Sequence, residues 1–295
     1  MKIAYSSLAA PAWDFPTLVA RAAEYGFDGL ELRGLQGELH LPLCPELTRS
    51  PEHIRKLLVE HKVELVCLGS SASLTAKKVK ELAKEKMAII EFIELAARLG
   101  CPHVRVFAGE TQGLDTREAC LARVAAMLMS LAPVAARYEV TLLIENGGDF
   151  AGSADLWYLI DAVGHPNVRC CWNQCNAMTL RERPTNSLPR LGGKIGMVHV
   201  CDASFHEGAL QDYKPIGEGH CEVGKQMELL KGLVFQRYVT FEWPKLWVES
   251  LPGPESILPQ AAKFLRSKID EKQAVLSAYK GDKNAPKLAS LPAAS

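Results

Sequence analysis

The chain has 295 residues, of which 48% are hydrophobic, so it can form one large core. Lysine plus arginine and aspartate plus glutamate each number 34, so no bulk charge attracts nucleic acid or a membrane surface. The first residues lack the features of a secretory signal, and no apolar run reaches the ~20 residues of a spanning helix. Nine scattered cysteines without a CxxC pair favour reduced, buried thiols, and we expect a cytoplasmic protein without nucleic-acid or membrane partners.

Short strand-like runs alternate with longer amphipathic segments along the chain. The first strand is predicted at 2–7, and a helix follows from Asp14, a plausible N-cap, to Gly26, a plausible helix stop. Pro184 and Pro189 leave room for one short helix in 177–192. The remaining strands are predicted at 29–33, 64–70, 103–108, 141–146, 168–173, 195–202 and 238–243, and the remaining helices from about 51 and at about 75–99, 115–138, 153–163, 222–235 and 255–276.

This alternation predicts the fold class. Strands that alternate with helices form a parallel sheet, and eight such units favour a closed barrel over a doubly wound sheet. The glycine-rich dinucleotide loop that would follow the first strand of a nicotinamide dehydrogenase is missing. We therefore predict a single-domain (β/α)8 TIM barrel over 1–276, followed by a C-terminal tail over 277–295 that has no apolar period.

Polar residues stand where these strands end, which is the face that carries the active site in a barrel of this kind. Because strand side chains alternate, Glu145, His199 and Glu242 are each expected to point into the barrel mouth. The polar residues at the strand ends are Glu31, Arg33, Arg105, Glu145, Asn146, Asn173, His199, Asp202 and Glu242.

Two carboxylates and one imidazole form a plausible ligand set for a divalent cation. Glu145, His199 and Glu242 supply oxygen and nitrogen donors, and a cation would offset the cost of half-buried carboxylates. The alternative is that each glutamate pairs with an arginine and that the histidine is a satisfied core residue. Three such residues at three strand ends favour a site.

Several segments also match a known family in their order and spacing. On these segments the chain resembles the xylose isomerase-like TIM-barrel superfamily, in its sugar isomerase/epimerase branch, over roughly 1–270. The segments are GFDGLEL at 26–32, LGCPHVRVF at 99–107, LIEN at 143–146, VHVCD at 198–202, PIGEG at 215–219 and FEW at 241–243.

The resemblance implies a divalent metal (Mn, Mg, Co or Zn) held by Glu145, Asn173, His199 and Glu242, with the two glutamates as the acid/base pair. The chain departs from the family pattern on strand six. The family usually has aspartate followed three residues later by histidine, and this chain has asparagine at 173 and 176. Cys201 also replaces a common lysine. A neutral amide removes one negative charge, so we expect weaker metal binding or none.

Other residues near the strand ends are candidates for substrate binding. Arg33 and Arg105 are expected to bind hydroxyls or a carboxylate, although surface pairing is an equal alternative for Arg33. Asp202 is expected to contact substrate or to hold neighbouring donors. The segment 217–220 is either a loop that closes over ligand or a plain turn. The remaining candidates are Asn176 and the tryptophans Trp13, Trp172, Trp243 and Trp247, which wall the pocket or cap the core.

These residues predict a metal-assisted isomerase or epimerase of a small sugar or related hydroxy-carbonyl compound. One alternative is a degenerate barrel that binds a small polyol without turnover, motivated by Asn173, Asn176 and Cys201. A second is the abasic-site nuclease branch, which the zero net charge and the 8 histidines disfavour. The expected partner is a carbohydrate-like small molecule, and a homodimer is compatible with the sequence.

Overall fold

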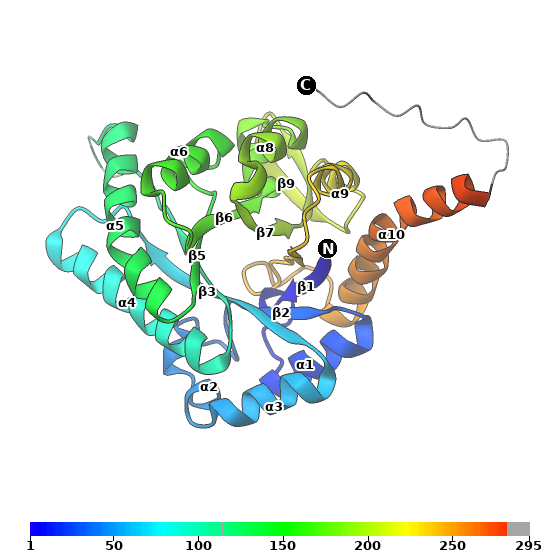
Figure 1. Ribbon diagram of the computed structural model, residues 1–295, viewed down its shortest axis with the longest axis horizontal. Helices are drawn as coiled ribbons and strands as arrows, with labels where there is room; N and C mark the ends of the chain where they lie inside the picture. Colours follow the sequence, from blue (N-terminus) through cyan, green and yellow to red (C-terminus); the bar gives the residue numbers. More distant parts are fainter. Residues whose placement is uncertain (112, 114, 282–295) are drawn as a thin grey trace, which may run out of the picture.

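The computed structural model describes residues 1–111, 113 and 115–281. In this part of the chain, parallel strands close into a barrel in the order β1-β10-β7-β6-β5-β4-β3-β2, and helices surround it (Figure 1). The architecture confirms the predicted (β/α)8 barrel. The barrel strands are β1 (Lys2–Ser6), β2 (Gly29–Leu32), β3 (Glu64–Ser73), β4 (His103–Phe107), β5 (Thr141–Glu145), β6 (Val168–Asn173), β7 (Ile195–Val200) and β10 (Tyr238–Phe241).

The helices fill the intervals between these strands. The α-helices are α1 (Phe15–Tyr25), α2 (Pro45–Thr48), α3 (Pro51–His61), α4 (Val79–Leu99), α5 (Arg117–Arg137), α6 (Ser153–Val163), α7 (Gln174–Ala177), α8 (Pro184–Leu191), α9 (Val223–Gly232) and α10 (Pro254–Gly281). Short 3-10 turns are η1 (Ser7–Ala9), η2 (Leu41–Leu43), η3 (Met178–Leu180) and η4 (Gly192–Lys194).

Local sequence signals explain where the first helix begins and ends. The Asp14 side chain accepts a 2.9 Å hydrogen bond from the backbone of Thr17, which satisfies one of the free N–H groups of the first turn. At the other end Gly26 adopts φ +83°, a left-handed conformation that glycine reaches without the steric cost of a Cβ atom. Both predicted boundary residues of α1 are confirmed.

The barrel interior has an apolar layer below the mouth. A buried cluster contains Ala4, Cys67, Leu143, Cys171 and Met197, one residue from each of five strands. Because side chains alternate along a strand, the residues two positions further on face the same interior, one layer closer to the mouth. Those residues are Ser6, Gly69, Glu145, Asn173 and His199. The apolar layer therefore supports a polar layer directly above it.

A β-hairpin absent from the prediction lies between β7 and α9. Strand β7 ends at Val200, and Asp202 begins β8 (Asp202–His206), which pairs antiparallel with β9 (Ala209–Lys214). The predicted strand over 195–202 was therefore too long. Glu207 and Gly208 both have positive φ at the turn, as in the tight turns that match strand twist.

The Asp202 carboxylate holds the loop over 215–221 through hydrogen bonds to the loop backbone. Asp202 Oδ2 accepts from the backbone of Gly217 at 2.9 Å, and its Oδ1 accepts from Cys221 at 3.0 Å. A Cβ atom on Gly219 would lie 2.2 Å from Asp202 Oδ1, so a side chain there would displace the carboxylate. The observed contacts of Asp202 are thus to its own loop.

Two further segments differ from the sequence expectation. Residues 177–192 contain η3 as well as α8, and α7 precedes them. Helix α10 continues to Gly281, so it extends into the predicted 277–295 tail, whose remaining residues lie outside the described part of the chain.

By length and composition alone, helix α5 could cross a membrane. No segment of this kind was expected from the amino-acid sequence. It packs beside β5, α4 and α6, and half of its most apolar window is buried, as expected for an outer helix of the barrel.

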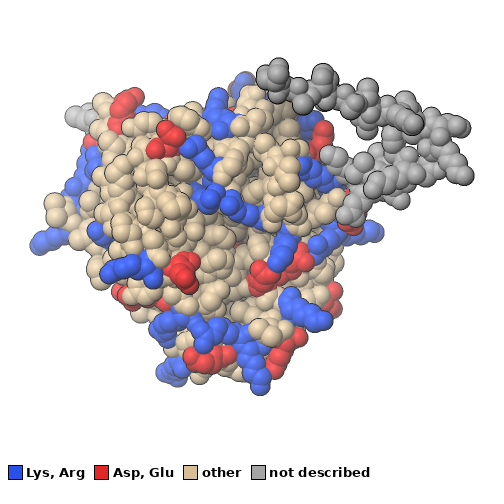
Figure 2. All heavy atoms as spheres, in the orientation of Figure 1, with Lys and Arg blue, Asp and Glu red and all other residues tan. Residues whose placement is uncertain are grey.

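All nine cysteines are buried, as the sequence predicted, and none of them is in a disulfide. Basic and acidic side chains are interspersed over the face of the molecule shown in Figure 2, without a large area of one sign. This distribution matches the equal numbers of basic and acidic residues in the sequence.

Candidate active site

The centre of the polar layer is His199, which lies between acidic side chains from three other strand ends. Its Nε2 atom is 2.8 Å from Glu31 Oε2, and its Nδ1 atom is 3.1 Å from Glu145 Oε1. Glu242 Oε1 lies 3.8 Å from the same Nδ1 atom. His199 and Glu31 are fully buried, and Glu242 is the most exposed of the four, at 16% of its side chain. Strands β2, β5, β7 and β10 thus converge on one imidazole.

A buried arginine balances one of these carboxylates. Arg105 Nε lies 3.0 Å from Glu145 Oε2, and Arg105 Nη1 donates to the backbone oxygen of Ser70 at 2.9 Å. The guanidinium carbon also lies 4.2 Å from the ring centroid of Phe107. Gly69 leaves room for this side chain, because a Cβ atom there would be 3.1 Å from Arg105 Nη2. In this arrangement Arg105 positions Glu145.

The Asn173 side chain links the two predicted catalytic glutamates. Its Nδ2 atom donates to Glu145 Oε1 and to Glu242 Oε2, each at 3.0 Å. Its Oδ1 atom accepts from the backbone of Cys175 at 3.0 Å and of Asn176 at 3.4 Å, which caps α7. The amide therefore presents its nitrogen to the site and its oxygen to the chain.

A second arginine stands at the edge of the cluster. Arg33 is 8% exposed, and its Nη2 atom donates to Ser71 Oγ at 2.9 Å. Its Nη1 atom is buried and has no hydrogen-bond partner among the described residues. The guanidinium lies 5.7 Å from the Trp247 ring centroid, and burial together with the charge of Arg105 lowers the pKa of Arg33 to about 10.

The environments of the two glutamates shift their pKa values in opposite directions. Burial raises the pKa of Glu242 to about 7, despite the nearby charge of His199. Burial acts on Glu145 as well, but the charges of His199 and Arg105 outweigh it and lower its pKa to about 2. For His199, burial disfavours the cation, but Cys171, Glu31 and Glu145 raise its pKa well above the ordinary value. Of these two glutamates, Glu145 is firmly ionised and Glu242 is readily protonated.

The amino-acid sequence matches the model of one protein family over most of its length. The family model described as xylose isomerase-like TIM barrel matches residues 19–268. The chain belongs to this family. The sequence resemblance is thereby confirmed.

Solved structures with the same fold include sugar epimerases and a probable dehydratase. An L-ribulose 3-epimerase superposes with a TM-score of 0.74 at 17% identity, covering 97% of this chain and 99% of that one. A D-tagatose 3-epimerase-like protein gives 0.74 at 18% identity, covering 94% and 100%. A probable 3-DHS dehydratase from Bacillus anthracis gives 0.75 at 17% identity, covering 90% and 99%. No curated protein sequence matches.

The xylose isomerase-like family implies a metal ion, and two of the four predicted ligands, Glu145 and His199, have the spacing for one. Bonds of about 2.1 Å place neighbouring octahedral ligands about 3 Å apart, close to the 3.1 Å between Glu145 Oε1 and His199 Nδ1, whereas Glu242 Oε1, 3.8 Å from Nδ1, would have to move closer. Glu31 holds the opposite ring nitrogen, as second-sphere carboxylates do for ligating histidines. Asn173 does not fit as oriented, because its oxygen caps α7.

A neighbouring group of side chains also has the spacing of a metal site. Ligand atoms of Glu145, Cys171 and His199 lie within 4.8 Å of one another. Burial raises the pKa of the Cys171 thiol to about 12, so the carboxylates are the better donors at neutral pH.

The tryptophans predicted as pocket walls occupy different environments. Trp172 and Trp243 are fully buried, and their indole nitrogens donate to Gln174 Oε1 and to the backbone oxygen of Pro252. Trp13 packs partly buried against the core. Trp247 is 54% exposed and stands beside Arg33, so it is the tryptophan best placed at the mouth.

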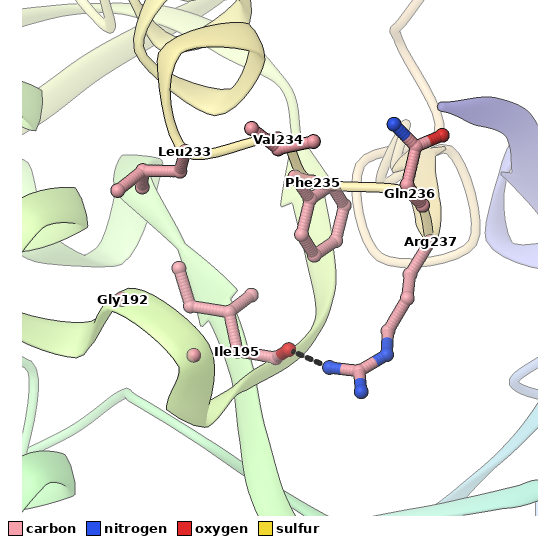
Figure 3. Close-up of a pocket in the computed structure, with 8 residues that line it drawn as sticks. Gly192, Ile195, Leu233, Val234, Phe235, Gln236 and Arg237 are labelled. Carbon is pink, nitrogen blue, oxygen red and sulfur yellow. Dashed lines mark hydrogen bonds between the residues drawn. The ribbon is translucent and has the colours of Figure 1, made fainter. Parts of the chain in front are cut away.

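The Asn176 side chain is engaged near the site, and its Nδ2 atom donates to the backbone oxygen of Asn146 at 2.7 Å. A separate hollow of about 280 Å³ lies at the opposite end of the barrel, where β7 and β10 begin (Figure 3). There the Arg237 guanidinium donates to the carbonyl of Ile195. Since catalytic groups of such barrels lie at the carboxyl ends of strands, this hollow is not the candidate active site.

Glu31 is the site residue whose role sequence reasoning missed. It was noted at the end of strand two but was not assigned to the site, although it contacts His199. The available signal was a carboxylate between Leu30 and Leu32, because an acid in an apolar strand needs a partner. Its Oε1 atom is buried without a hydrogen-bond partner among the described residues.

Proposed function

We propose that this chain is an isomerase or epimerase that moves a proton next to the carbonyl group of a small sugar or related hydroxy-carbonyl compound. The observation that carries the proposal is the position of Glu145 and Glu242, which share the Asn173 amide nitrogen at 3.0 Å each. Two carboxylates that approach one point from different strands suit removal and return of a proton at one carbon. The sugar epimerases of the same fold support this substrate class.

The unequal pKa values of the two glutamates suit a division of labour. Glu145 stays ionised because His199 and Arg105 lower its pKa, which also makes it the weaker base of the two. Glu242, with a pKa of about 7, exchanges protons readily near neutral pH. While no metal is bound, His199, held by Glu31, contributes positive charge beside the carbanion or enediolate that develops on the substrate. As a metal ligand it would be neutral, and the cation would supply that charge.

Substrate oxygens would be bound by groups at the edge of the cluster. The Nη1 atom of Arg33 has no partner among the described residues, so it could donate to a substrate hydroxyl or carboxylate if the guanidinium rotates towards the barrel mouth. Trp247, which lies beside Arg33, and Asn176, which donates to the backbone of Asn146, are the other groups that would contact the sugar. Arg105 acts through Glu145, since its Nε atom lies beside Glu145 Oε2 and its Nη1 atom donates to the backbone of Ser70.

A divalent ion (Mn, Mg, Co or Zn) would be held by Glu145, His199 and Glu242. When bound, it would polarise the substrate carbonyl and hydroxyl oxygens. Asn173 would become a fourth ligand only if its amide turned over, at the cost of the two backbone hydrogen bonds at the start of α7.

The test is incorporation of solvent deuterium into candidate keto and aldo sugars, with each of the four cations and with chelator. We expect exchange in wild type and a loss of about 10²–10⁴-fold in Glu145→Gln and Glu242→Gln, because each removes a general acid/base group. Glu60→Gln, an exposed glutamate on α3, is the matched control.

Thermal unfolding of each variant establishes that the loss is chemical. Binding of sugars without exchange in wild type, under every cation, would instead support the non-catalytic polyol-binding alternative. Exchange that survives in both Gln variants would remove the two glutamates from the mechanism.

A further inference from the structure

A cavity of about 370 Å³ lies beside the proposed active site, at the carboxyl ends of β3, β4 and β5. It reaches Gly147, two residues after Glu145, so it adjoins the reacting centre. Neither Glu145 nor Glu242 lines it. Residues that line it include Ser71, Ser73, Thr75, Phe107, Glu110 and Gly147.

One wall of this cavity is a row of hydroxyl groups. Ser71 and Ser73, near the end of strand β3, both line the cavity, and Ser73 Oγ lies 3.3 Å from Thr75 Oγ1. Gly109 permits the close approach of the next loop, because a Cβ atom there would lie 2.1 Å from Ser73 Oγ. Hydroxyls both donate and accept hydrogen bonds, so such a row matches the alternating needs of a polyol.

Another wall is aromatic. The Phe107 ring lines the cavity and contacts the Arg105 guanidinium, whose central carbon is 4.2 Å from the ring centroid. An aromatic surface beside hydroxyl groups suits the apolar C–H face of a sugar ring together with its polar edge.

The charge of the lining argues against an anionic occupant. The described lining residues include one acid, Glu110, and no lysine or arginine. A phosphate or carboxylate here would meet no lysine or arginine among the lining residues and would be repelled by Glu110.

The size of the cavity indicates what it holds. At about 30 Å³ for each water-sized group, 370 Å³ accommodates about a dozen non-hydrogen atoms, the size of one hexose unit. We propose that this cavity binds the second, uncharged sugar unit of a glycoside whose keto unit reacts between Glu145 and Glu242. The inference rests on the proposed function and specifies the substrate as a keto disaccharide or related glycoside.

The experiment compares D-fructose with two disaccharides that contain it, lactulose and isomaltulose, by calorimetric binding and by deuterium exchange. We expect at least one disaccharide to bind about tenfold more tightly than D-fructose. The double variant Ser73→Ala/Thr75→Val removes two hydroxyls while keeping the cavity shape, and should abolish this advantage without changing the affinity for D-fructose.

A second variant, Glu110→Trp, places a bulky side chain at the exposed rim and should also weaken disaccharide binding selectively. Glu60→Trp on α3 is its matched control. Disaccharide affinity equal to or below that of D-fructose overturns the inference, as does tighter binding of D-fructose 6-phosphate than of either disaccharide.

The two proposals can fail separately. If D-fructose undergoes deuterium exchange but neither disaccharide binds more tightly than D-fructose, the proposed function stands and the cavity is rejected as a site for a second sugar unit. A disaccharide advantage that the double variant abolishes, without exchange on any sugar, would support the site and reject the isomerase reaction.

Discussion

Residues two positions apart on the same strands of this barrel have opposite characters. Leu143 and Met197 belong to a buried apolar layer, whereas Glu145 and His199 directly above them form a charged cluster. Strand geometry is the same for both layers, since each points its side chains into the barrel. The difference is that the lower layer is held by close packing, and the upper one by complementary charges and hydrogen bonds.

The contrast suggests that residues on one strand can contribute separately to the stability of the fold and to acid/base chemistry. A cavity created in the apolar layer by a smaller side chain should lower the free energy of unfolding without altering the acid/base groups. A neutralised carboxylate in the polar layer should alter the chemistry while leaving the packing below it intact. The following changes test that separation.

The largest effect on stability is expected from Leu143→Ala. Leu143 is fully buried, so the substitution should lower the free energy of unfolding by about 2–5 kcal/mol, measured by urea denaturation. Deuterium exchange per folded molecule should stay within about twofold of wild type. Loss of exchange without loss of stability would show that the two layers are not separable.

An intermediate effect on the free energy of unfolding is expected when the pH is changed, because Glu242 titrates near neutral pH. Its pKa is raised to about 7 in the folded state, so its protonation stabilises the fold at low pH, and this contribution is lost as pH rises through about 7. In the presence of chelator, Glu242→Gln should therefore be more stable than wild type at pH 8, by about 1–3 kcal/mol, with the difference vanishing below pH 4.5.

Glu145, in the same cluster, should give a pH dependence of stability that is opposite in sign to that of Glu242. Because its pKa is lowered to about 2, the ionised Glu145 side chain stabilises the fold at pH values above the ordinary glutamate pKa of 4.5. This stabilisation is lost as the pH falls towards about 2. Urea unfolding of wild type, Glu242→Gln and Glu145→Gln between pH 3 and pH 8 measures both effects. A Glu242→Gln curve parallel to wild type would show that Glu242 does not titrate as described.

The smallest effect is expected at position 173. Asn173→Asp adds a negative charge between the two glutamates and should raise the affinity for Mn²⁺ about tenfold, measured by calorimetry. Asn176→Asp is the comparison variant on the same short helix. Equal Mn²⁺ affinity in Asn173→Asp and wild type would exclude this position as a ligand.

Part of the site was predictable because strand alternation is a local rule. It placed Glu145 and His199 on the interior face, two residues above apolar neighbours, and the structure agrees. The hairpin β8–β9 was missed, and its signal was the Glu207–Gly208 turn between two short runs. Asp202 was expected to contact substrate or to hold neighbouring donors, and its oxygens accept from the backbone of its own loop, as the second expectation describes.

Periodicity and capping act over a few neighbouring residues, so the amino-acid sequence was enough to predict the βα rhythm, the caps of α1 and the set of polar residues that end the strands. Which of those polar atoms meet depends on how the barrel closes. Barrel closure brings Glu31 to His199 across 168 positions of sequence and turns the Asn173 nitrogen towards both glutamates. Such pairings depend on distances between strands that no local pattern encodes.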